Sequence, residues 1–148
     1  MKIETSQFGT IKIEEEKIIT MPAGMPGFQG KKRFILLERK EMIPFYWYHS
    51  VDDPYLAFTI INPYLFKPDY SVDIKSTLRE MSWEGDGKEN LKLYVVVNAP
   101  KGSPDNITAN LVGPLLINIL KYKAVQMVLD NSLYSCRYPI LQTSKIID

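Results

Sequence analysis

The side chains best suited to chemistry in this sequence are His49, Cys136 and the adjacent pair Asp52 and Asp53. His49 is the only histidine of the chain and follows an aromatic run. A histidine acts as a general base when a nucleophile and an orienting carboxylate converge on it. Ser50 and Asp52 are close in sequence, but neighbours on one strand or turn rarely converge on a single substrate atom. We therefore expect His49 to be a partly exposed residue at the end of a strand.

The paired carboxylates and the single cysteine do not predict a catalytic site either. Asp52-Asp53 is followed by Pro54, a combination typical of an exposed turn in which an Asp side chain binds the backbone. Cys136 lies beside Arg137, whose charge favours a thiolate, but the sequence holds no second cysteine or histidine to assist it. A structural zinc site takes four Cys or His ligands. We predict no catalytic residue, no metal site and no cofactor, and hence no enzyme.

A glycine- and proline-rich segment, Gly24–Phe28, could suggest a phosphate-binding loop. It lacks the Lys-Ser or Lys-Thr end that a P-loop needs to reach the phosphates and their metal ion. The segment is more typical of a rigid turn, and we expect this turn to place Phe28 in the core.

Features that suit binding are better represented than features that suit catalysis. The chain has nine tyrosines and two tryptophans, and such residues are enriched at protein interfaces because they bury a large area at low entropic cost. Several lie in proline-rich stretches, above all Asn62–Tyr70, whose prolines favour an extended backbone that cannot complete a regular ladder. For any single aromatic residue, packing in the core or against a loop is the alternative. For the whole stretch, an interface and loop packing are both open.

Short β-strands have to position these residues. Short apolar or alternating runs, separated by Pro, Gly, Asn and Asp, predict strands within residues 8–14, 17–21, 33–39, 44–49, 56–61, 91–98, 107–111, 115–119 and 123–129. Helical spacing is found only in Ile74–Met81, with Asp73 as the predicted N-cap. The pattern predicts an all-β fold, a small antiparallel β-barrel that forms a single domain over residues 1–148, with one or two short helices.

Composition narrows the function further. The chain has 148 residues, of which 45% are apolar and 24% charged, as in an ordinary soluble domain. Its 18 basic and 17 acidic residues give no charge excess of the kind that phosphate-backbone binding requires. No apolar run approaches the roughly 20 residues that span a bilayer, and the first residues do not resemble a signal peptide. We expect a cytoplasmic monomer that binds neither membrane nor nucleic acid directly.

A series of motifs occurs in the order found in one known family. They are Phe8-Gly9, Ile18-Ile19-Thr20, Gly24–Phe28, Pro44–Trp47, Ser50–Pro54, Leu56–Phe58, Asn62-Pro63, Pro68–Tyr70, Thr108–Leu111 with Pro114, Ile117-Asn118, and Gln126–Asp130. Each motif is weak alone, but together and in register they are specific. On these residues the chain resembles the FliW family, the flagellar assembly factors of bacteria, along essentially its full length.

The resemblance implies a β-barrel-like partner switch. Members of the family bind flagellin in the cytoplasm, and they also bind CsrA, the RNA-binding translational repressor of flagellin messenger RNA. The two partners exchange, so that secretion of flagellin frees the protein to sequester CsrA and restart flagellin synthesis. The antagonism is described as allosteric, away from the RNA-binding surface of CsrA. If this carries over, each partner must weaken binding of the other, because such coupling is reciprocal.

The resemblance limits the expected contact residues to motif positions in loops. Acidic residues there could face basic side chains of a partner, and aromatic residues could act as anchors. The predicted contact residues are Asp52, Asp53, Tyr55, Asn62, Phe66, Asp69 and Tyr70. The alternative is that Asn62-Pro63 and Pro68-Asp69 hold a long loop in shape. On the contact hypothesis, Phe66→Ala should weaken binding and leave the thermal midpoint nearly unchanged, whereas a large loss of stability would place Phe66 in the core.

Three features depart from the family pattern. Ile117–Gln126 replaces an Asn-Pro and a basic, glycine-containing turn, which leaves the geometry of that hairpin open. Tyr138 stands where a histidine is expected, which removes a titratable group. The family tends to be acidic, whereas this chain has a net charge of +1, so that electrostatic steering toward a basic partner should be weaker.

Two other function classes are alternatives. The first is a small oligonucleotide-binding barrel that stacks bases on Tyr and Trp faces and contacts phosphates through lysines. Such a protein would bind single strands in a salt-dependent way, and the neutral charge balance disfavours it. The second is an enzyme with an unrecognised site, which the missing catalytic constellation makes the least favoured of the three.

Overall fold

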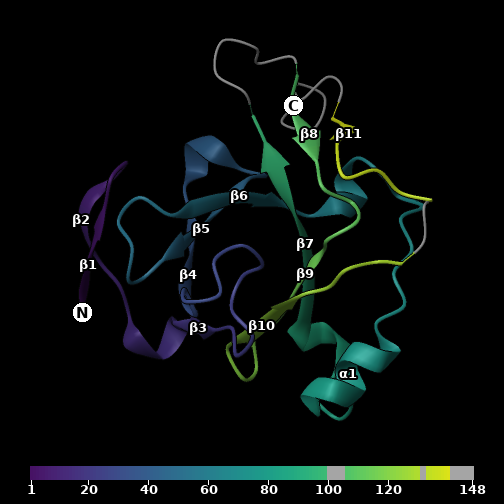
Figure 1. Cartoon of the computed structure of the whole chain (residues 1–148). Coiled ribbons are helices and arrows are strands. Elements are labelled where there is room, and N and C mark those ends of the chain that lie inside the picture. Colours follow the sequence, from purple (N-terminus) through teal and green to yellow (C-terminus); the bar gives the residue numbers. More distant parts are fainter. Residues whose placement is uncertain (100–105, 131–132, 141–148) are drawn as a thin grey trace.

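The structure, a computed structural model, describes residues 1–99, 106–130 and 133–140. Within these residues seven strands form a closed ring, because β7 pairs with both β6 and β9 (Figure 1). In order around the ring they are β3 (Ile19–Thr20), β4 (Arg33–Glu38), β5 (Tyr46–Ser50), β6 (Ala57–Ile61), β7 (Leu91–Asn98), β9 (Leu115–Asn118) and β10 (Lys123–Gln126). The predicted all-β barrel is confirmed.

Two small additions extend the ring. β8 (Thr108–Ala109) pairs with the end of β7, and β11 (Tyr138–Pro139) pairs with β8. A separate hairpin is formed by β1 (Lys2–Thr5) and β2 (Gly9–Lys12). The short 3-10 turns are η1 (Glu15–Lys17), η2 (Lys40–Met42), η3 (Pro63–Leu65) and η4 (Lys88–Asn90). No helix in the described ranges has both the length and the apolar character needed to cross a bilayer.

The ring is antiparallel with one exception. β10 lies parallel to β3, where Lys123 pairs with Thr20. This pairing departs from the predicted antiparallel barrel, and it does not come from a β-α-β unit. It arises because the last strand of the ring returns to a strand near the start of the chain.

The barrel interior is filled by alternate residues of the ring strands, as the two-residue period of a strand requires. Its fully buried side chains include Ile19, Phe34, Tyr48, Ile60, Leu115, Ile117 and Ala124. The rings of Phe34 and Tyr48 are stacked, with centroids 4.6 Å apart. The outer faces of several ring strands are also buried, because other segments of the chain cover them.

The β1–β2 hairpin covers the outer face of β4 and β5. Ile3 and Ile13 pack on Ile35, and the ring of Phe8 meets Trp47 edge-on, with centroids 5.6 Å apart. Our predicted strand within residues 8–14 is correct for β2, but β1 was not predicted, because Ile3 is its only apolar residue.

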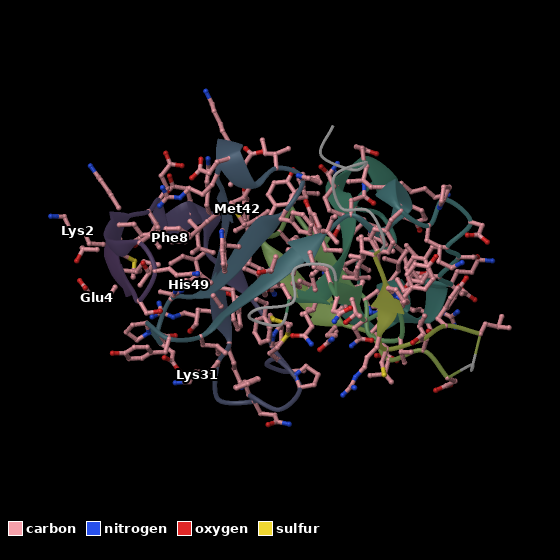
Figure 2. The ribbon with its side chains drawn as sticks, turned by 90° about the horizontal axis from the view of Figure 1, so that it is seen from above. Lys2, Glu4, Phe8, Lys31, Met42 and His49 are labelled. Atoms are coloured by element: carbon pink, nitrogen blue, oxygen red, sulfur yellow. The ribbon has the colours of Figure 1, made fainter. Side chains whose placement is uncertain are left out.

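His49 lies under this hairpin. It pairs with Ile35 across β4 and β5, so both side chains point to the same covered face. Figure 2 shows Lys2 and Glu4 pointing away from the barrel at the outer edge of the hairpin. His49 is 1% exposed, and its Nδ1 lies 2.7 Å from the carbonyl oxygen of Ser50. The expectation of a partly exposed histidine is wrong, because it was made without the strand that covers the site.

The only α-helix of the described residues is α1 (Lys75–Met81), at the predicted place. The carboxylate of Asp73 accepts a hydrogen bond from the backbone N–H of Lys75 at 3.0 Å, although the cap position itself is held by Ile74. Asp73 thus supports the first turn of α1 as predicted, but the N-cap is Ile74, one residue after the predicted position.

Trp83 joins α1 to the outer face of the barrel. It is 1% exposed and belongs to a cluster with Leu116 of β9 and Met127. Ile74 and Leu78 of the helical segment pack against the same cluster. The indole fills the space between the helix and the strands and is one of the largest fully buried side chains among the described residues.

The turn at Gly24–Phe28 is confirmed, but it buries a different residue from the one predicted. The N–H of Phe28 donates to the carbonyl oxygen of Met25 at 2.7 Å. Met25 is 2% exposed and enters the barrel core, whereas Phe28 is 44% exposed. Gly24 adopts φ +72°, and a Cβ there would lie 2.5 Å from the backbone oxygen of Gln29. The tight turn therefore directs Met25 inward and leaves Phe28 on the rim.

The β9–β10 turn is held by a fully buried amide. Asn118 Oδ1 accepts hydrogen bonds from the N–H of Leu120 at 2.9 Å and of Lys121 at 3.1 Å, and its Nδ2 donates to Asp86 Oδ2 at 2.8 Å. Tyr122 completes the turn in the left-handed region, at φ 51°. The departure from the family pattern at this hairpin thus gives a turn that uses a tyrosine in a conformation usually left to glycine.

Among the side chains that the structure describes, one buried polar atom has no hydrogen-bond partner. The hydroxyl of Tyr48 is buried in the barrel, and no described residue hydrogen-bonds to it. Burial raises the pKa of this phenol above its ordinary value. Leaving such a group unpaired is unfavourable.

We expect Tyr48→Phe to stabilise the protein by about 1 kcal/mol, because it removes the unpaired hydroxyl and keeps the ring that stacks on Phe34. For a chain of this size that gain raises the thermal midpoint by about 2–4 °C. Calorimetry of the two proteins measures it. A lower midpoint for Tyr48→Phe would mean that the hydroxyl is hydrogen-bonded in solution.

Candidate partner-binding site

The predicted contact residues lie in two groups, at opposite ends of β6. Asp52, Asp53 and Tyr55 lie in the turn between β5 and β6, before Ala57, where the strand begins. The other four lie in the segment that follows the end of the strand at Ile61. A five-residue strand is about 16 Å long. The structure therefore does not bring the seven residues together in one patch.

In the first group the carboxylates are already paired. Asp52 forms a two-pronged ion pair with the Arg33 guanidinium, which lowers the pKa of its carboxyl below the usual value. Asp53 Oδ1 accepts from the N–H of Tyr55 at 2.9 Å, and its Oδ2 lies 3.8 Å from Lys31 Nζ. Tyr55 is 84% exposed. The predicted Asp-rich turn is confirmed, and Tyr55 is the residue of this group whose side chain is most open to a partner.

In the second group Asn62 and Asp69 have local partners. Asn62 Oδ1 accepts from the N–H of Tyr64 at 2.9 Å and so caps η3. The Asp69 side chain is 81% exposed and lies 3.2 Å from Lys67 Nζ. Asn62 and Asp69 therefore both make contacts within their own loop, as the hypothesis of loop packing predicted. Most of the Asp69 side chain nevertheless remains exposed.

Phe66 and Tyr70 tie this loop to the end of the described chain. Phe66 is half-buried and stacks on Tyr138, with centroids 5.9 Å apart. Tyr70 is 3% exposed, and its hydroxyl donates to the carbonyl oxygen of Leu111 at 2.6 Å. Tyr70 presents no surface to a partner in this structure. Because Phe66 packs on Tyr138, we now expect Phe66→Ala to lower stability as well, which makes it a poor probe of contact alone.

A groove opens where β6 stops and β7 continues. The β6–β7 ladder ends with Ile61 opposite Val95. The next hydrogen-bonded position would fall to Pro63, which has no N–H to donate, and the chain leaves the sheet in η3. β7 continues for four more residues, Leu91–Tyr94, and pairs there with β9 on its other side. The wall of the barrel thus has an open edge beside this half of β7.

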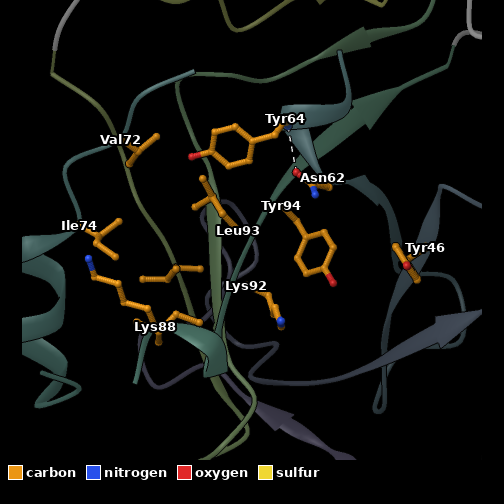
Figure 3. A pocket seen from close by; sticks show the side chains of 11 residues that line it. Tyr46, Asn62, Tyr64, Val72, Ile74, Lys88, Lys92, Leu93 and Tyr94 are labelled. Carbon is orange, nitrogen blue, oxygen red and sulfur yellow. Dashed lines mark hydrogen bonds between the residues drawn. The ribbon is translucent and has the colours of Figure 1, made fainter. Parts of the chain in front are cut away.

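This edge borders a hollow beside the predicted loop, which we call the β7 groove. It has a volume of about 410 Å³. Figure 3 shows Tyr64 and Asn62 at one end of it and Lys88 at the other, with Leu93 and Tyr94 between them. It is lined by Tyr46, Asn62, Tyr64, Val72, Ile74, Lys88, Leu91, Lys92, Leu93, Tyr94 and Leu116.

The lining combines an apolar floor with a polar margin. Leu93 and Val72 contribute apolar surface, and Tyr46 and Tyr94 meet edge-on with centroids 5.7 Å apart. Burial raises the pKa of Tyr94, and the neighbouring Tyr46 and Glu38 add to this effect. An arrangement of this kind suits a polypeptide with both apolar and polar side chains.

Of the residues that line the β7 groove, only Asn62 is among the contact residues predicted from the sequence. Tyr64 lies inside the stretch Asn62–Tyr70, whereas Lys92 and Tyr94 belong to a segment that was predicted only as a strand, within residues 91–98. A signal was present in Pro63, because a proline directly after a strand predicts that its ladder stops there. What the sequence could not supply is that the neighbouring strand would continue past that point.

Comparison with known proteins gives a consistent result. A family model described as "FliW protein" matches residues 2–140. A protein of Alkaliphilus metalliredigens named flagellar assembly factor FliW is 39% identical over 144 residues, which cover 96% of this chain and 87% of the relative. A protein of the same name from Geobacter sulfurreducens is 41% identical over 139 residues, covering 94% and 86%.

A solved structure agrees with the sequence relatives. The crystal structure of the flagellar assembly factor FliW superposes with a TM-score of 0.86 at 33% sequence identity. The match covers 95% of this chain and 97% of that one.

Proposed function

Since the chain belongs to the FliW family, we propose that it is a flagellar assembly factor that binds flagellin in the cytoplasm. When free of flagellin, the protein binds CsrA and antagonises it allosterically, which relieves repression of flagellin translation. The observation that carries the proposal is the family match over residues 2–140, together with relatives named for flagellar assembly. The protein acts as a monomeric binding protein and has no catalytic role.

The β7 groove and the loop beside it are the proposed main contact surface. The groove offers apolar and aromatic surface, and Asn62, Phe66 and Asp69 of the predicted set lie in the adjoining loop. Tyr70 supports this surface from the core. The turn with Asp52, Asp53 and Tyr55 is a second and smaller contact, at the far end of β6.

The switch is tested by calorimetric titration of the protein with the flagellin of its host and, separately, with CsrA. Each titration is repeated with the other partner already bound. Binding to both partners with mutual weakening is the expected result. If the protein binds flagellin but not CsrA, it acts as an assembly chaperone, and the proposed regulation through CsrA is wrong. If neither partner binds, the proposed function fails.

Two tyrosine variants separate the two contact surfaces. Tyr64→Ala in the β7 groove should weaken binding of the partner protein, flagellin or CsrA, at least about tenfold. This corresponds to about 1.4 kcal/mol of binding free energy. Tyr55→Ala should weaken it less than about threefold. Both side chains are exposed, at 42% and 84%, so neither change should alter folding much, and thermal melting is the control. A larger effect of Tyr55→Ala would move the main contact to the β5–β6 turn.

A further inference from the structure

The open edge of β7 can be assigned atom by atom from its ladder. The N–H of Ile119 donates to the carbonyl oxygen of Asn90 at 2.9 Å, and the N–H of Asn110 donates to that of Val96 at 2.9 Å. In an antiparallel ladder, residues that bond the neighbour on one side alternate with those that bond the neighbour on the other. The even-numbered residues of β7 therefore direct their main-chain groups away from β6, and the odd-numbered residues direct theirs toward it.

Leu91 and Leu93 are odd-numbered residues beyond the end of β6. The N–H of Leu91 donates to the carbonyl oxygen of Lys88 and is satisfied. From the β6 side, no described residue hydrogen-bonds to the N–H or C=O of Leu93 or to the C=O of Leu91. A strand edge with free main-chain groups is a template for pairing with another chain.

The side chains beside this edge specify the chemistry of what would pair with it. Leu91 and Leu93 point to the outer face, where Val72 and Ile74 also lie. Lys92 and Tyr94 alternate with them and point to the other face. A paired strand would thus place apolar side chains on one face and polar ones on the other.

The cations beside this edge favour a negatively charged partner: Lys92 lies on the polar face, and the Lys88 ammonium lies toward Ile74 at the end of the groove (Figure 3). Lys88 and Lys92 line the groove, both are exposed, and neither forms an ion pair with any described residue. Two uncompensated ammonium groups next to a strand edge favour carboxylates on the incoming chain and disfavour lysines or arginines.

We propose that the edge of β7 at Leu91–Tyr94 binds an extended segment of a protein partner as an added β-strand, with alternating apolar and acidic side chains. The segment bonds to the main chain of Leu93, sets its apolar side chains against Leu91, Leu93 and Val72, and sets its carboxylates on the face of Lys92, with Lys88 as a second cation at the end of the groove. Four residues of β7 give a contact about 13 Å long. The inference deepens the proposed function, since it assigns a mode of binding to the partner.

The test uses the full chain and a synthetic peptide, acetyl-Val-Glu-Val-Glu-Val-amide, followed by amide NMR. The peptide should shift the amide signal of Leu93 and slow its hydrogen exchange at least about tenfold at saturation, because that N–H becomes hydrogen-bonded. The matched peptide with Lys in place of Glu should bind at least about tenfold more weakly. If both peptides bind equally, or if Leu93 is unaffected by the acidic one, the inference is wrong.

A charge-reversal variant provides the second measurement. Lys92→Glu should weaken the acidic peptide at least about fivefold and should improve binding of the lysine peptide. Lys40→Glu, at an exposed lysine outside the groove, is the matched control and should change neither. Since the peptide swap on the unchanged protein gives the same information, a folding defect in the variant does not prevent the test.

Titrations with flagellin and CsrA separate this inference from the proposed function. If either protein binds while the Leu93 amide keeps its exchange rate, the strand-addition mode is wrong and the function stands. If neither binds but the acidic peptide protects Leu93, the function fails and the mode stands. Protection of Leu93 that grows with protein concentration, with dimers in sedimentation, would make a second copy of this chain the occupant and would overturn the proposal.

Discussion

Trp83→Ala is expected to lower the free energy of unfolding by about 3–5 kcal/mol, the range for a large aromatic side chain removed from a core. Trp83 is 1% exposed and packs between α1 and the strands β9 and β10. Its backbone N–H also donates to the carbonyl oxygen of Leu78 at 2.8 Å, at the end of the helix. A seven-residue helix is too short to be stable by itself in water. Loss of the indole therefore removes both core volume and the anchor of α1.

Urea unfolding followed by circular dichroism measures this change. Val128→Ala is a suitable control, because Val128 is an apolar residue that is 72% exposed, and its truncation should cost less than about 0.5 kcal/mol. A cost below about 1.5 kcal/mol for Trp83→Ala would show that α1 is not held by this residue in solution.

Asn118→Asp is expected to be the most damaging change that conserves side-chain size. The Asn118 amide is fully buried and donates from Nδ2 to Asp86 Oδ2 at 2.8 Å. Partial burial alone would raise the pKa of Asp86, but hydrogen bonds from Asn118 and Lys121 lower it below its ordinary value. The substitution places a second carboxylate where the donor was. Losing a hydrogen bond to a charged group at a buried position costs about 1.5–3 kcal/mol.

The sign of the pH dependence identifies the cause. Two carboxylates at this distance cannot both ionise easily, so the pKa of one of them in the folded protein rises above its unfolded value. The variant is then destabilised at neutral pH, and the deficit relative to the parent protein shrinks as the pH falls toward about 4, where one carboxyl is protonated. A deficit that does not change with pH would contradict this explanation.

A double swap provides the matched control. In Asn118→Asp with Asp86→Asn, the amide donates from residue 86 to the carboxylate at 118, and the carboxylate still accepts from the N–H groups of Leu120 and Lys121. We expect the double variant to recover most of the lost stability at pH 7. Recovery would show that the stability depends on pairing one hydrogen-bond donor with one acceptor at positions 86 and 118, and not on which position carries the amide.

The strands of the ring were largely predictable because each is a local pattern. β4, β5, β6 and β7 carry strong apolar runs between clear turn residues, and the predicted ranges overlap all of them. β1 was not predicted, since Ile3 is the only apolar side chain among its four residues. That single omission removed the cover over His49 and so produced the wrong expectation for its exposure.

The candidate site was less predictable because it depends on how strands of different length meet. Asp52 and Asn62 could be assigned to turns from their neighbours alone, and both are found there. That these turns lie at opposite ends of one strand follows from the prediction of β6 itself, but the β7 groove does not. The groove exists because β7 extends beyond the point at which Pro63 ends the β6–β7 ladder. The pairing register of two distant strands cannot be predicted from either segment alone.

The parallel contact between β3 and β10 bears on how the chain reaches its native state. The ring closes only when Lys123 meets Thr20, two residues separated by most of the sequence. Contacts between such distant residues must overcome a large loop-closure entropy before they contribute stability, which slows folding. During synthesis β3, β4, β5 and β6, which end at Ile61, are completed well before β10 begins at Lys123. Until then β3 has an unpaired edge in the nascent chain, and the barrel can close only after β10 has been synthesised.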